Sequence, residues 1–391
     1  MNKNIKILDD VGIKISTTQE NLAHGLSVVS RVSGKNINLP ILQNVLVKAH
    51  DGQIRLSTTN LEIAINCTVR GKVDQGGEFT VPARLFSEYI GLLPSQNIDL
   101  NVQGTKLTVK SGKFETELHG IPATEFPVIP EVSGGATFTV PVEDFRKAIG
   151  SVIFATAQHE SRPELSGVFF GFNQSSNGVG TLTLAATDSY RLGETVLSLA
   201  ESNPEDQLSV IVPARTVAEL GRIIGIGHDE MSVPKAITIV VTENQIQFTT
   251  GAVELVSRLV MGQYPDYRQI VPTQFKTEAL LPREEFMKAV KAASLFSKPG
   301  LYDVRLEFGP GRPLAIHAAD AGTGEYHTEI EGAVTGSENH VVVNYKYLLD
   351  GLGAMNDDEV NFKMIDGSNP CLVTPKNKEE KYLYIVMPIK Q

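Results

Sequence analysis

Hydrophobic and polar positions along the 391-residue chain repeat a short pattern, in which one strand is followed by one amphipathic helix. The clearest copies are VPARLFSEYIGLLP at 81–94 and VPARTVAELGRIIG at 212–225. In each copy a β-type run ends in Val-Pro, and proline suits the first turn of a helix because its missing N–H has no intrahelical partner there. The pattern predicts a helix that covers a sheet with one apolar stripe, which in the first copy consists of Leu85, Phe86, Tyr89, Ile90 and Leu93.

Looser copies of this pattern begin near residues 18, 140, 281 and 343, so the chain contains six units at intervals of 59 to 72 residues. After each of the first two helices come three β-type runs with alternating apolar residues, separated by turn dipeptides such as Asp51-Gly52. Each unit is therefore predicted to be a strand, a helix and three further strands.

Two stretches rich in Pro and Gly interrupt the units, GIPATEFPVIPEVSGG at 120–135 and GQYPDYRQIVP at 262–272. As linkers they divide the chain into three parts with two units each. We therefore expect an N-terminal extension at 1–12 and three similar α+β domains at 13–130, 136–270 and 276–391, each with an internal twofold repeat of one helix plus antiparallel strands.

Charge refines this picture, because 35 Lys and Arg against 45 Asp and Glu give a net charge of −10. Such a balance argues against a protein that holds nucleic acid by its overall charge. The charged residues at positions expected on the outer faces of the helices have a net charge of +2, opposite in sign to that of the whole chain. This fits either a local nucleic-acid surface or ordinary solvated faces. These positions hold Arg84, Glu88, Glu143, Lys147, Arg215, Glu219, Arg222, Glu284, Lys288, Lys291, Lys346 and Asp350.

The sequence shows no pattern of catalytic chemistry. Gly225-Ile226-Gly227 lacks the third glycine of a dinucleotide site, and Gly309-Pro310-Gly311 is not followed by the Lys of a phosphate-binding loop. The eight histidines have no metal-binding spacing on any predicted helix. We expect no metal, no cofactor and no enzymatic activity, and we interpret Cys67 and Cys371 as buried thiols of a cytoplasmic protein.

Several sequence segments, in this order, closely resemble the bacterial DNA polymerase III β subunit family, the sliding clamps. They are LPILQNVLV (39–47), LSTTNLEIAI (56–65), VPARLFSEYIGLLP, the FPVIP linker, LAATDSYRLGE (184–194), VPARTVAELGRII, YPDYRQIVP (264–272) and YLYIVMPIK (382–390). The resemblance covers residues 13–391. It implies a head-to-tail homodimeric ring with helices inside and sheets outside, which encircles duplex DNA and tethers the replicative polymerase and other clients. A separate ATP-driven loader would place it on DNA.

The resemblance also implies three groups of site residues. The residues expected to face DNA are Lys35, Asn36, Arg84, Gln158, His159, Arg162 and Arg215, and many relatives have arginine where this chain has Asn36. A dimer contact is expected between Thr116 and Leu118 of the first domain and Leu295 and Phe296 of the third. A pocket for short client peptides is expected from Leu165, Thr187, Ser189, Tyr190, Arg191, Leu192, Pro265, Ile270, Leu301, Asn344, Tyr347, Pro370, Val386, Met387, Pro388 and Ile389.

Alternatives remain for these assignments. Without the resemblance, the pocket residues could be a β-edge packed into the core of the third domain, and Leu295 and Phe296 could be core at the end of their helix. Ser189-Tyr190 stands where Gly-His is commoner in the family, which suggests a clamp paralogue whose altered pocket tolerates a toxin or antibiotic. An enzyme built on a repeat scaffold would require an acid/base pair in a cleft, and the sequence displays none.

Overall fold

The computed structural model describes residues 12–33, 39–158, 162–174, 180–202, 207–226 and 234–390, so the predicted extension at 1–12 lies almost wholly outside the described residues. One α-helix occurs in each of the six predicted units, which confirms the repeat. The helices are α1 (Gln19–Val29), α2 (Ala83–Leu92), α3 (Val142–Val152), α4 (Ala214–Gly225), α5 (Arg283–Ala293) and α6 (Tyr345–Gly353). Short 3-10 turns are η1 (Pro40–Gln43), η2 (Ala123–Glu125), η3 (Ile153–Ala155), η4 (Pro163–Leu165), η5 (Tyr267–Ile270) and η6 (Ser294–Phe296).

The helices begin in two different ways. Pro82, Pro141 and Pro282 occupy the N-cap position, one residue before the first helical turn in which the sequence placed them, and make no side-chain cap. In the first and last units a polar side chain replaces the proline. Thr18 accepts a hydrogen bond from the Asn21 N–H, and Asn344 accepts from two N–H groups of α6. Proline removes its own N–H and so leaves one fewer donor without an intrahelical partner, whereas Thr18 and Asn344 satisfy donors directly.

Two details of the helix prediction are wrong. The apolar pattern of the first unit predicts a helix from Gln19 to Ser33, but α1 ends at Val29, with Ser30 as its C-cap. On α2 the buried stripe is narrower than expected, because Phe86 and Ile90 are fully buried while Leu85 is 51% exposed. Leu85 therefore belongs to the outer face of the helix, with Arg84 and Glu88.

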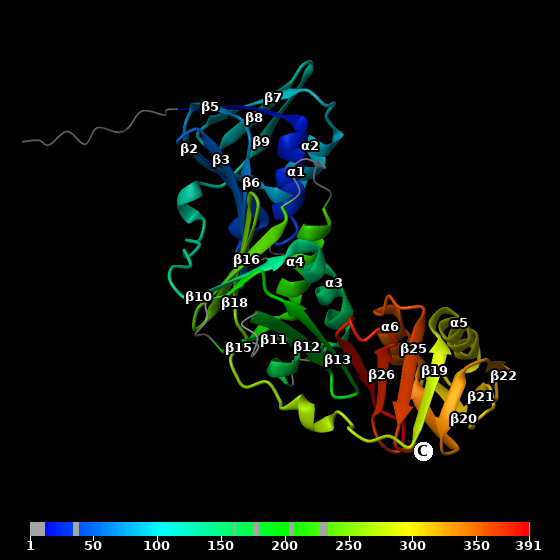
Figure 1. Cartoon of the computed structure of the whole chain (residues 1–391). Coiled ribbons are helices and arrows are strands. Elements are labelled where there is room, and N and C mark those ends of the chain that lie inside the picture. Colours follow the sequence, from blue (N-terminus) through cyan, green and yellow to red (C-terminus); the bar gives the residue numbers. More distant parts are fainter. Residues whose placement is uncertain are drawn as a thin grey trace, which may run out of the picture. The chain divides into compact units, whose positions relative to one another are not determined.

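The chain divides into two compact units, of which the first comprises residues 1–139 and 223–258. Its helices α1 and α2 lie side by side (Figure 1) and α1 packs on β3 and β4. One of its sheets has the order β5-β1-β7-β8-β9, with strands Lys72–Gln75, Ile13–Thr18, Asn97–Gln103, Lys106–Ser111 and Phe114–His119. The other runs β10-β16-β17-β18-β4-β3-β2-β6, with strands Ala136–Pro141, Ala236–Val241, Gln245–Thr250, Val253–Arg258, Ile63–Val69, Gln53–Thr59, Asn44–His50 and Gly77–Pro82.

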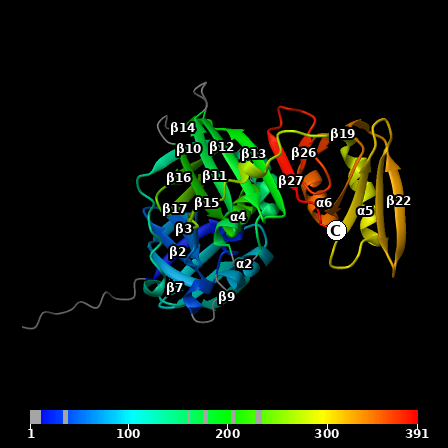
Figure 2. The ribbon, with the colours of Figure 1, turned by 90° about the horizontal axis from the view of Figure 1, so that it is seen from below.

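The second unit comprises residues 140–222 and 259–391. Its nine-stranded sheet has the order β15-β11-β12-β13-β27-β26-β25-β19-β23, with strands Leu208–Pro213, Gly167–Gln174, Gly180–Thr187, Arg191–Ser198, Tyr382–Val386, Cys371–Pro375, Glu359–Met364, Thr277–Pro282 and Ala333–Gly336. A four-stranded sheet runs β22-β21-β20-β24, with strands Gly324–Ile330, Leu314–Asp320, Asp303–Phe308 and Asn339–Asn344. Helix α5 packs against β22 (Figure 2). A two-residue strand, β14, is Glu201–Ser202.

Strand pairing joins the predicted domains into continuous sheets. Within the first unit, β18 of the middle third pairs antiparallel with β4 of the first third, with Leu255 opposite Ile65. Within the second unit, β13 of the middle third pairs in the same way with β27 of the last third, with Gly193 opposite Tyr384. At the first junction, β4 is the third strand after α1 of the first domain, and β18 is the third strand after α4 of the second domain. At the second junction, β13 is the third strand after α3, and β27 is the third strand after α6.

The sequence analysis missed one short strand in the first half of each third, namely β5, β14 and β23. Two of them add to the first strand of their own third, since β5 pairs with β1 and β23 pairs with β19. Runs of two to four residues, such as KVDQ in β5, are too short to show a clear alternation of apolar and polar positions.

Cys67 and Cys371 are buried free thiols, as expected. Burial raises the pKa of Cys67 to about 11 and that of Cys371 to about 12. No helix within the described ranges is long and apolar enough to cross a membrane.

Candidate functional site

The C-terminal segment after β27 lies between two other parts of the second unit. The Met387 N–H donates to the carbonyl of Tyr190 at 2.9 Å, and the Ile389 N–H donates to the carbonyl of Val342 at 2.8 Å. Pro388 forms an isolated bridge with Val343. Residues 387–389 are thereby fixed between the β12–β13 turn and strand β24, which brings together these predicted pocket residues from distant parts of the sequence.

The β12–β13 turn is held by its own side chains. Asp188 Oδ1 accepts hydrogen bonds from the N–H groups of Tyr190 and Arg191 at 2.9 and 3.0 Å, and Thr187 Oγ1 accepts from the Ser189 N–H at 3.1 Å. Ser189 has a φ of 77°, a left-handed conformation that costs a residue with a Cβ about 1–2 kcal/mol. The hydrogen bonds of the turn hold it in place despite this cost. The turn therefore fixes the backbone of Tyr190, whose side chain is 63% exposed.

Arg191 is the one charged residue among the predicted pocket residues, and its side chain is already engaged within the fold. Its guanidinium forms ion pairs with Asp188 and Asp350, donates to the carbonyl of Phe154, and lies 4.5 Å from the centre of the Tyr347 ring. Burial acts to lower the pKa of Arg191, but the hydrogen bond to Asp350 and the nearby carboxylates outweigh it and raise the pKa. Arg191 therefore holds the Tyr347 ring in place.

Asn344, another polar member of the predicted pocket, also acts within the fold, because its side-chain oxygen caps α6. The carbonyl of Tyr347 on that helix accepts a 2.7 Å hydrogen bond from the Tyr384 hydroxyl of β27. The close approach of α6 to β27 requires Gly351, since a Cβ there would lie 2.3 Å from the Tyr384 ring. The helix that bears Tyr347 is thus positioned directly on the strand that leads to Met387.

The remaining predicted pocket residues separate into a buried layer and an exposed rim. Leu165 and Leu192 belong to a core cluster with Tyr264, Tyr267 and Ile385, against which Met387 packs. Thr187 and Val386 are also buried, so these four residues are packed in the interior, but only Val386 belongs to the last third, whose core the alternative named. The exposed or partly exposed members are Ser189, Tyr190, Pro265, Ile270, Leu301, Tyr347, Pro370, Met387, Pro388 and Ile389.

The linker at 262–272 completes this region with aromatic residues that the sequence analysis did not assign. Tyr264 and Tyr267 are buried and pack on Phe169 with ring centres 5.4 and 6.0 Å away. The Tyr264 hydroxyl accepts from the Thr187 N–H at 3.1 Å, and the Tyr267 hydroxyl donates to Glu194. The two tyrosines fix the linker, and with it Pro265 and Ile270, to the sheet. Their presence in YPDYRQIVP was visible in the sequence, but their burial was not.

The residues expected to face DNA lie in several parts of the chain. Lys35, Asn36 and His159 lie outside the described residues. Arg84 and Arg215 are exposed in the first turns of α2 and α4, and Gln158 and Arg162 are exposed on either side of the undescribed 159–161 segment. Arg84 forms an exposed ion pair with Glu88.

Most of the predicted outer-face carboxylates on the helices are neutralised by ion pairs with neighbouring residues. Glu143, Glu219 and Glu284 pair with Arg146, Arg222 and Lys288 of their own helices. Among the described residues, Lys147 on α3, Arg215 on α4 and Lys291 on α5 have no carboxylate in ion-pair contact, and all three are exposed. At the predicted outer-face positions the charges left after pairing are therefore positive, although exposed Asp144 on α3 and Glu285 on α5 likewise have no cation in ion-pair contact among the described residues.

Two of the expected dimer residues, Thr116 and Leu118, belong to a strand with a free edge, and the other two, Leu295 and Phe296, lie in the 3-10 turn η6. β9, which contains Thr116 and Leu118, is the last strand of its sheet, and β22 is the last strand of another. Phe296 stacks on Tyr326 of β22 with ring centres 5.8 Å apart, while Leu295 is 73% exposed. Phe296 is therefore packed within its own domain, and Leu295 is available on the surface.

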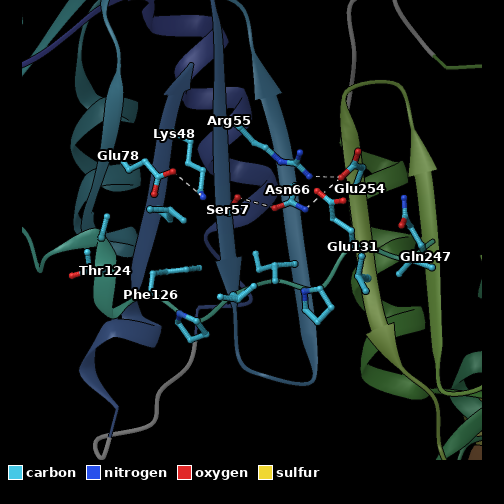
Figure 3. Close-up of a pocket in the computed structure, with 18 residues that line it drawn as sticks. Lys48, Arg55, Ser57, Asn66, Glu78, Thr124, Phe126, Glu131, Gln247 and Glu254 are labelled. Carbon is cyan, nitrogen blue, oxygen red and sulfur yellow. Dashed lines mark hydrogen bonds and ion pairs between the residues drawn. The ribbon is translucent and has the colours of Figure 1, made fainter. Parts of the chain in front are cut away.

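A cavity of about 680 Å³ lies elsewhere, in the first unit, between the linker at 123–132 and the strands β2, β3, β4 and β18 (Figure 3). Its charged side chains are mostly paired, Lys48 with Glu78 at 3.0 Å and Arg55 with Glu254 at 2.5 Å. Ser57 donates to Asn66 at 2.7 Å across its floor. None of the predicted site residues lines it, so its geometry gives no support to any of the predicted sites.

Comparisons with known proteins agree along the whole chain. Models of the N-terminal, central and C-terminal domains of the DNA polymerase III beta subunit match residues 13–130, 139–266 and 268–390. Proteins named beta sliding clamp from Synechococcus elongatus and Pseudomonas aeruginosa are each 30% identical over 97% and 95% of this chain, and 99% and 98% of their own.

Solved structures give the same result for the fold. A Pseudomonas aeruginosa sliding clamp bound to griselimycin superposes with a TM-score of 0.89 at 30% identity, over 97% of this chain and 100% of that one. A Bacillus subtilis DNA polymerase sliding clamp superposes with a TM-score of 0.89 at 26% identity, over 97% of this chain and 99% of that one. With three matching domain models in sequence order and full-length relatives, the chain belongs to the DNA polymerase III beta subunit family, the beta sliding clamps.

Proposed function

We propose that this protein is a DNA sliding clamp, a homodimeric ring that encircles duplex DNA and tethers the replicative DNA polymerase and other clients. Its domains are placed at 13–130, 136–270 and 276–391, with helices lining the ring and sheets outside. It acts as a non-catalytic processivity subunit in the cytoplasm, without cofactor, and a separate ATP-driven loader opens it. The absence of a phosphate-binding loop from the sequence accords with that division of labour.

The observation that carries this proposal is the free edge at each end of the repeat. Inside the chain, two pairs of strands join neighbouring domains. In each pair, the third strand after the first helix of one domain (β4 or β13) pairs with the third strand after the second helix of the next domain (β18 or β27). Only two such strands remain among the described residues, β22 in the first half of the last domain and β9 in the second half of the first. A second copy would pair β9 with β22 twice, which is a head-to-tail arrangement that closes.

The charges support a ring that surrounds DNA without gripping it. The net charge of −10 disfavours contact of the outer surface with phosphate, whereas the helix faces retain Lys147, Arg215 and Lys291 without carboxylate partners among the described residues. Duplex DNA presents one negative charge per about 1.7 Å of its axis. A few exposed cations on the helices are therefore enough for weak, sequence-independent contact with phosphate. Arg84, Gln158 and Arg162 are the other described residues assigned to this contact, with Lys35, Asn36 and His159 beyond them.

The client site is placed around Tyr190, Tyr347 and Met387, and its ligand is a short linear peptide with apolar and aromatic residues. An exposed aromatic ring, a flexible thioether and adjacent prolines suit several related peptides. The griselimycin-bound Pseudomonas structure is a relative that holds a ligand, which supports the presence of a small-molecule or peptide pocket in the family.

Ser189 and Tyr190 favour one second candidate, a clamp paralogue with an altered pocket that tolerates a toxin or antibiotic. Tyr190 is 63% exposed at the rim of the proposed pocket and could narrow it. Such a paralogue would bind griselimycin more weakly than the Pseudomonas clamp while still binding client peptides, whereas equal griselimycin affinity would remove the reason for this candidate.

Primer extension tests the proposed function. A primed single-stranded circle is copied by the polymerase and clamp loader of the source cell, with and without this protein, under conditions that permit one polymerase binding event. The proposal predicts products many times longer when the protein, the loader and ATP are all present. Unchanged product length with an active loader would contradict it.

A further inference from the structure

The outer face of the four-stranded sheet in the second unit contains two neighbouring rows of polar side chains. In one row His327 of β22 lies opposite His317 of β21, which lies opposite Arg305 of β20. In the adjacent row Glu329 lies opposite Ala315, which lies opposite Glu307. The small Ala315 side chain leaves a depression between the two glutamates, and it forms part of a cavity of about 530 Å³ that both histidines also line.

The two imidazoles face each other closely. Their Nδ1 atoms are 3.1 Å apart and their ring centres 4.3 Å apart. Two neutral rings can hold this contact only if one Nδ1 bears a proton and the other accepts it, because two lone pairs would repel. The site between the two nitrogens therefore requires a cation or a shared hydrogen.

Carboxylates stand behind both rings. Glu307 Oε2 is 3.6 Å from His317 Nε2, and Glu329 Oε1 is 3.8 Å from His327 Nε2. Arg305 Nε donates a 2.7 Å hydrogen bond to Glu307 Oε1, which holds that carboxylate in place beside His317. Carboxylates in this position favour a proton on Nε2 and leave Nδ1 as the free lone pair, as the outer partners of metal-binding histidines do.

We propose that His317 and His327 bind one divalent transition-metal ion of the zinc class through their two Nδ1 atoms. At a metal–nitrogen distance of about 2.0–2.1 Å, nitrogens 3.1 Å apart subtend about 100° at the ion, close to tetrahedral geometry. The described residues contain no group of three or more His, Cys, Asp or Glu side chains that converges on a metal, so water fills the other positions. Binding is accordingly reversible, and it displaces the hydrogen shared by the rings.

The spacing of histidines on predicted helices does not reveal this pair, because both residues lie on strands. The residues that meet here are ten positions apart, on two strands joined by a hairpin. An ion at this position would tie β22, which has a free outer edge, to β21. It would do so without any contact with the proposed peptide pocket.

Calorimetric titration of the full-length, tag-free, chelator-treated protein with ZnCl₂ tests the proposal. We expect one ion per chain, and a loss of affinity of about tenfold or more in each of His317→Asn and His327→Asn, since each removes one of two ligands. The matched control is His340→Asn, because His340 lies on the same face of this sheet, opposite Glu307, but outside the pair. It should bind zinc as the unaltered protein does.

Three results would overturn the proposal. They are no zinc binding by the unaltered protein, retention of binding in both pair variants, and loss of binding in only one of them. If the unaltered protein does not bind zinc, the two Nδ1 atoms share a hydrogen and the pair binds no metal ion. Circular dichroism of each variant confirms that it is folded, and both rings are partly exposed, so asparagine is tolerated at either position.

Discussion

The guanidinium of Arg191 on β13 contacts the carboxylate of Asp350 on α6, and this ion pair joins the middle and last thirds of the chain beside the β13–β27 junction. The same guanidinium holds Asp188 in the β12–β13 turn and lies over the ring of Tyr347. Only 11% of the Arg191 side chain is exposed, whereas 46% of Asp350 is. One side chain thus connects the sheet junction, the turn and the helix that form the proposed client site.

Replacing Asp350 by asparagine should lower the free energy of unfolding by about 1 kcal/mol, because it removes a charged partner from a mostly buried guanidinium at a half-exposed position. Urea denaturation measures the change. The control is Glu88→Gln, which breaks the exposed Arg84–Glu88 pair of α2 and should have no measurable effect. Equal stability of the Asp350 variant and the unaltered protein would mean that Arg191 needs only Asp188.

Proline in place of Glu117 should separate the proposed dimer without unfolding the chain. In the β8–β9 hairpin, Ser111 lies opposite Phe114 across a two-residue turn, so the alternation of an antiparallel ladder turns the Glu117 N–H outward. Proline removes that donor from the free edge. Sedimentation should then give a mass close to the 42.4 kDa of one chain.

The matched variants for this edge are Glu117→Ala and Thr116→Pro. The alanine variant keeps the N–H and should remain dimeric, whereas proline at Thr116 removes an inward donor to β8 and should destabilise the fold itself. A Glu117→Pro protein that still sediments as a dimer would place the joint somewhere other than β9.

Shortening Tyr190 to alanine should weaken client-peptide binding about tenfold, which corresponds to about 1.4 kcal/mol for an exposed aromatic contact. Because 63% of Tyr190 is exposed, the fold should not change. Fluorescence anisotropy with a labelled peptide from the polymerase C-terminus measures the affinity. Leu92→Ala removes a similarly exposed apolar side chain, 84% exposed on α2, and should bind as before; unchanged affinity in the Tyr190 variant would move the site away from this turn.

The two buried thiols make the protein less stable at alkaline pH. Burial raises the pKa of Cys67 from 9.0 to about 11 and of Cys371 from 9.0 to about 12, so between pH 9 and these values the folded chain keeps protons that the unfolded chain has lost. This contribution to stability is complete below pH 9 and is lost as the pH rises, by at most about 1.4 kcal/mol per pH unit per thiol.

Urea denaturation at pH 8 and pH 10 measures this loss, and Cys67→Ala should make the loss smaller. A thiol reagent at pH 8 should modify neither cysteine until the chain unfolds. Rapid modification of the folded protein would show that the thiols are accessible.

The sequence was a good guide to the elements and a poor guide to the contacts between them. Apolar periodicity predicts six helices because each buries one stripe, and it predicts three strands after each of the first two helices, as observed in β2, β3 and β4 and in β7, β8 and β9. The pairings of β4 with β18 and of β13 with β27 join residues about 190 positions apart, and no local pattern encodes them.

For the proposed client site, too, the residues could be predicted from the sequence but their contacts could not. The resemblance brought Tyr190, Tyr347 and Met387 together, but nothing local indicated that Arg191 and Asn344 are occupied by Asp350 and by the start of α6. The positive φ of Ser189 was likewise hidden, because the turn is stabilised by Asp188 and Thr187 and needs no glycine. Tertiary partners decide these roles.

Retention on circular and linear DNA is the most direct test of the ring. The protein is loaded by its loader and ATP onto a nicked circular plasmid, freed of unbound protein by gel filtration, and the plasmid is then cut once. The account predicts retention on the uncut circle, loss after the cut, and retention again when both ends of the cut DNA are blocked by bound protein. Equal retention on circular and unblocked linear DNA would contradict it.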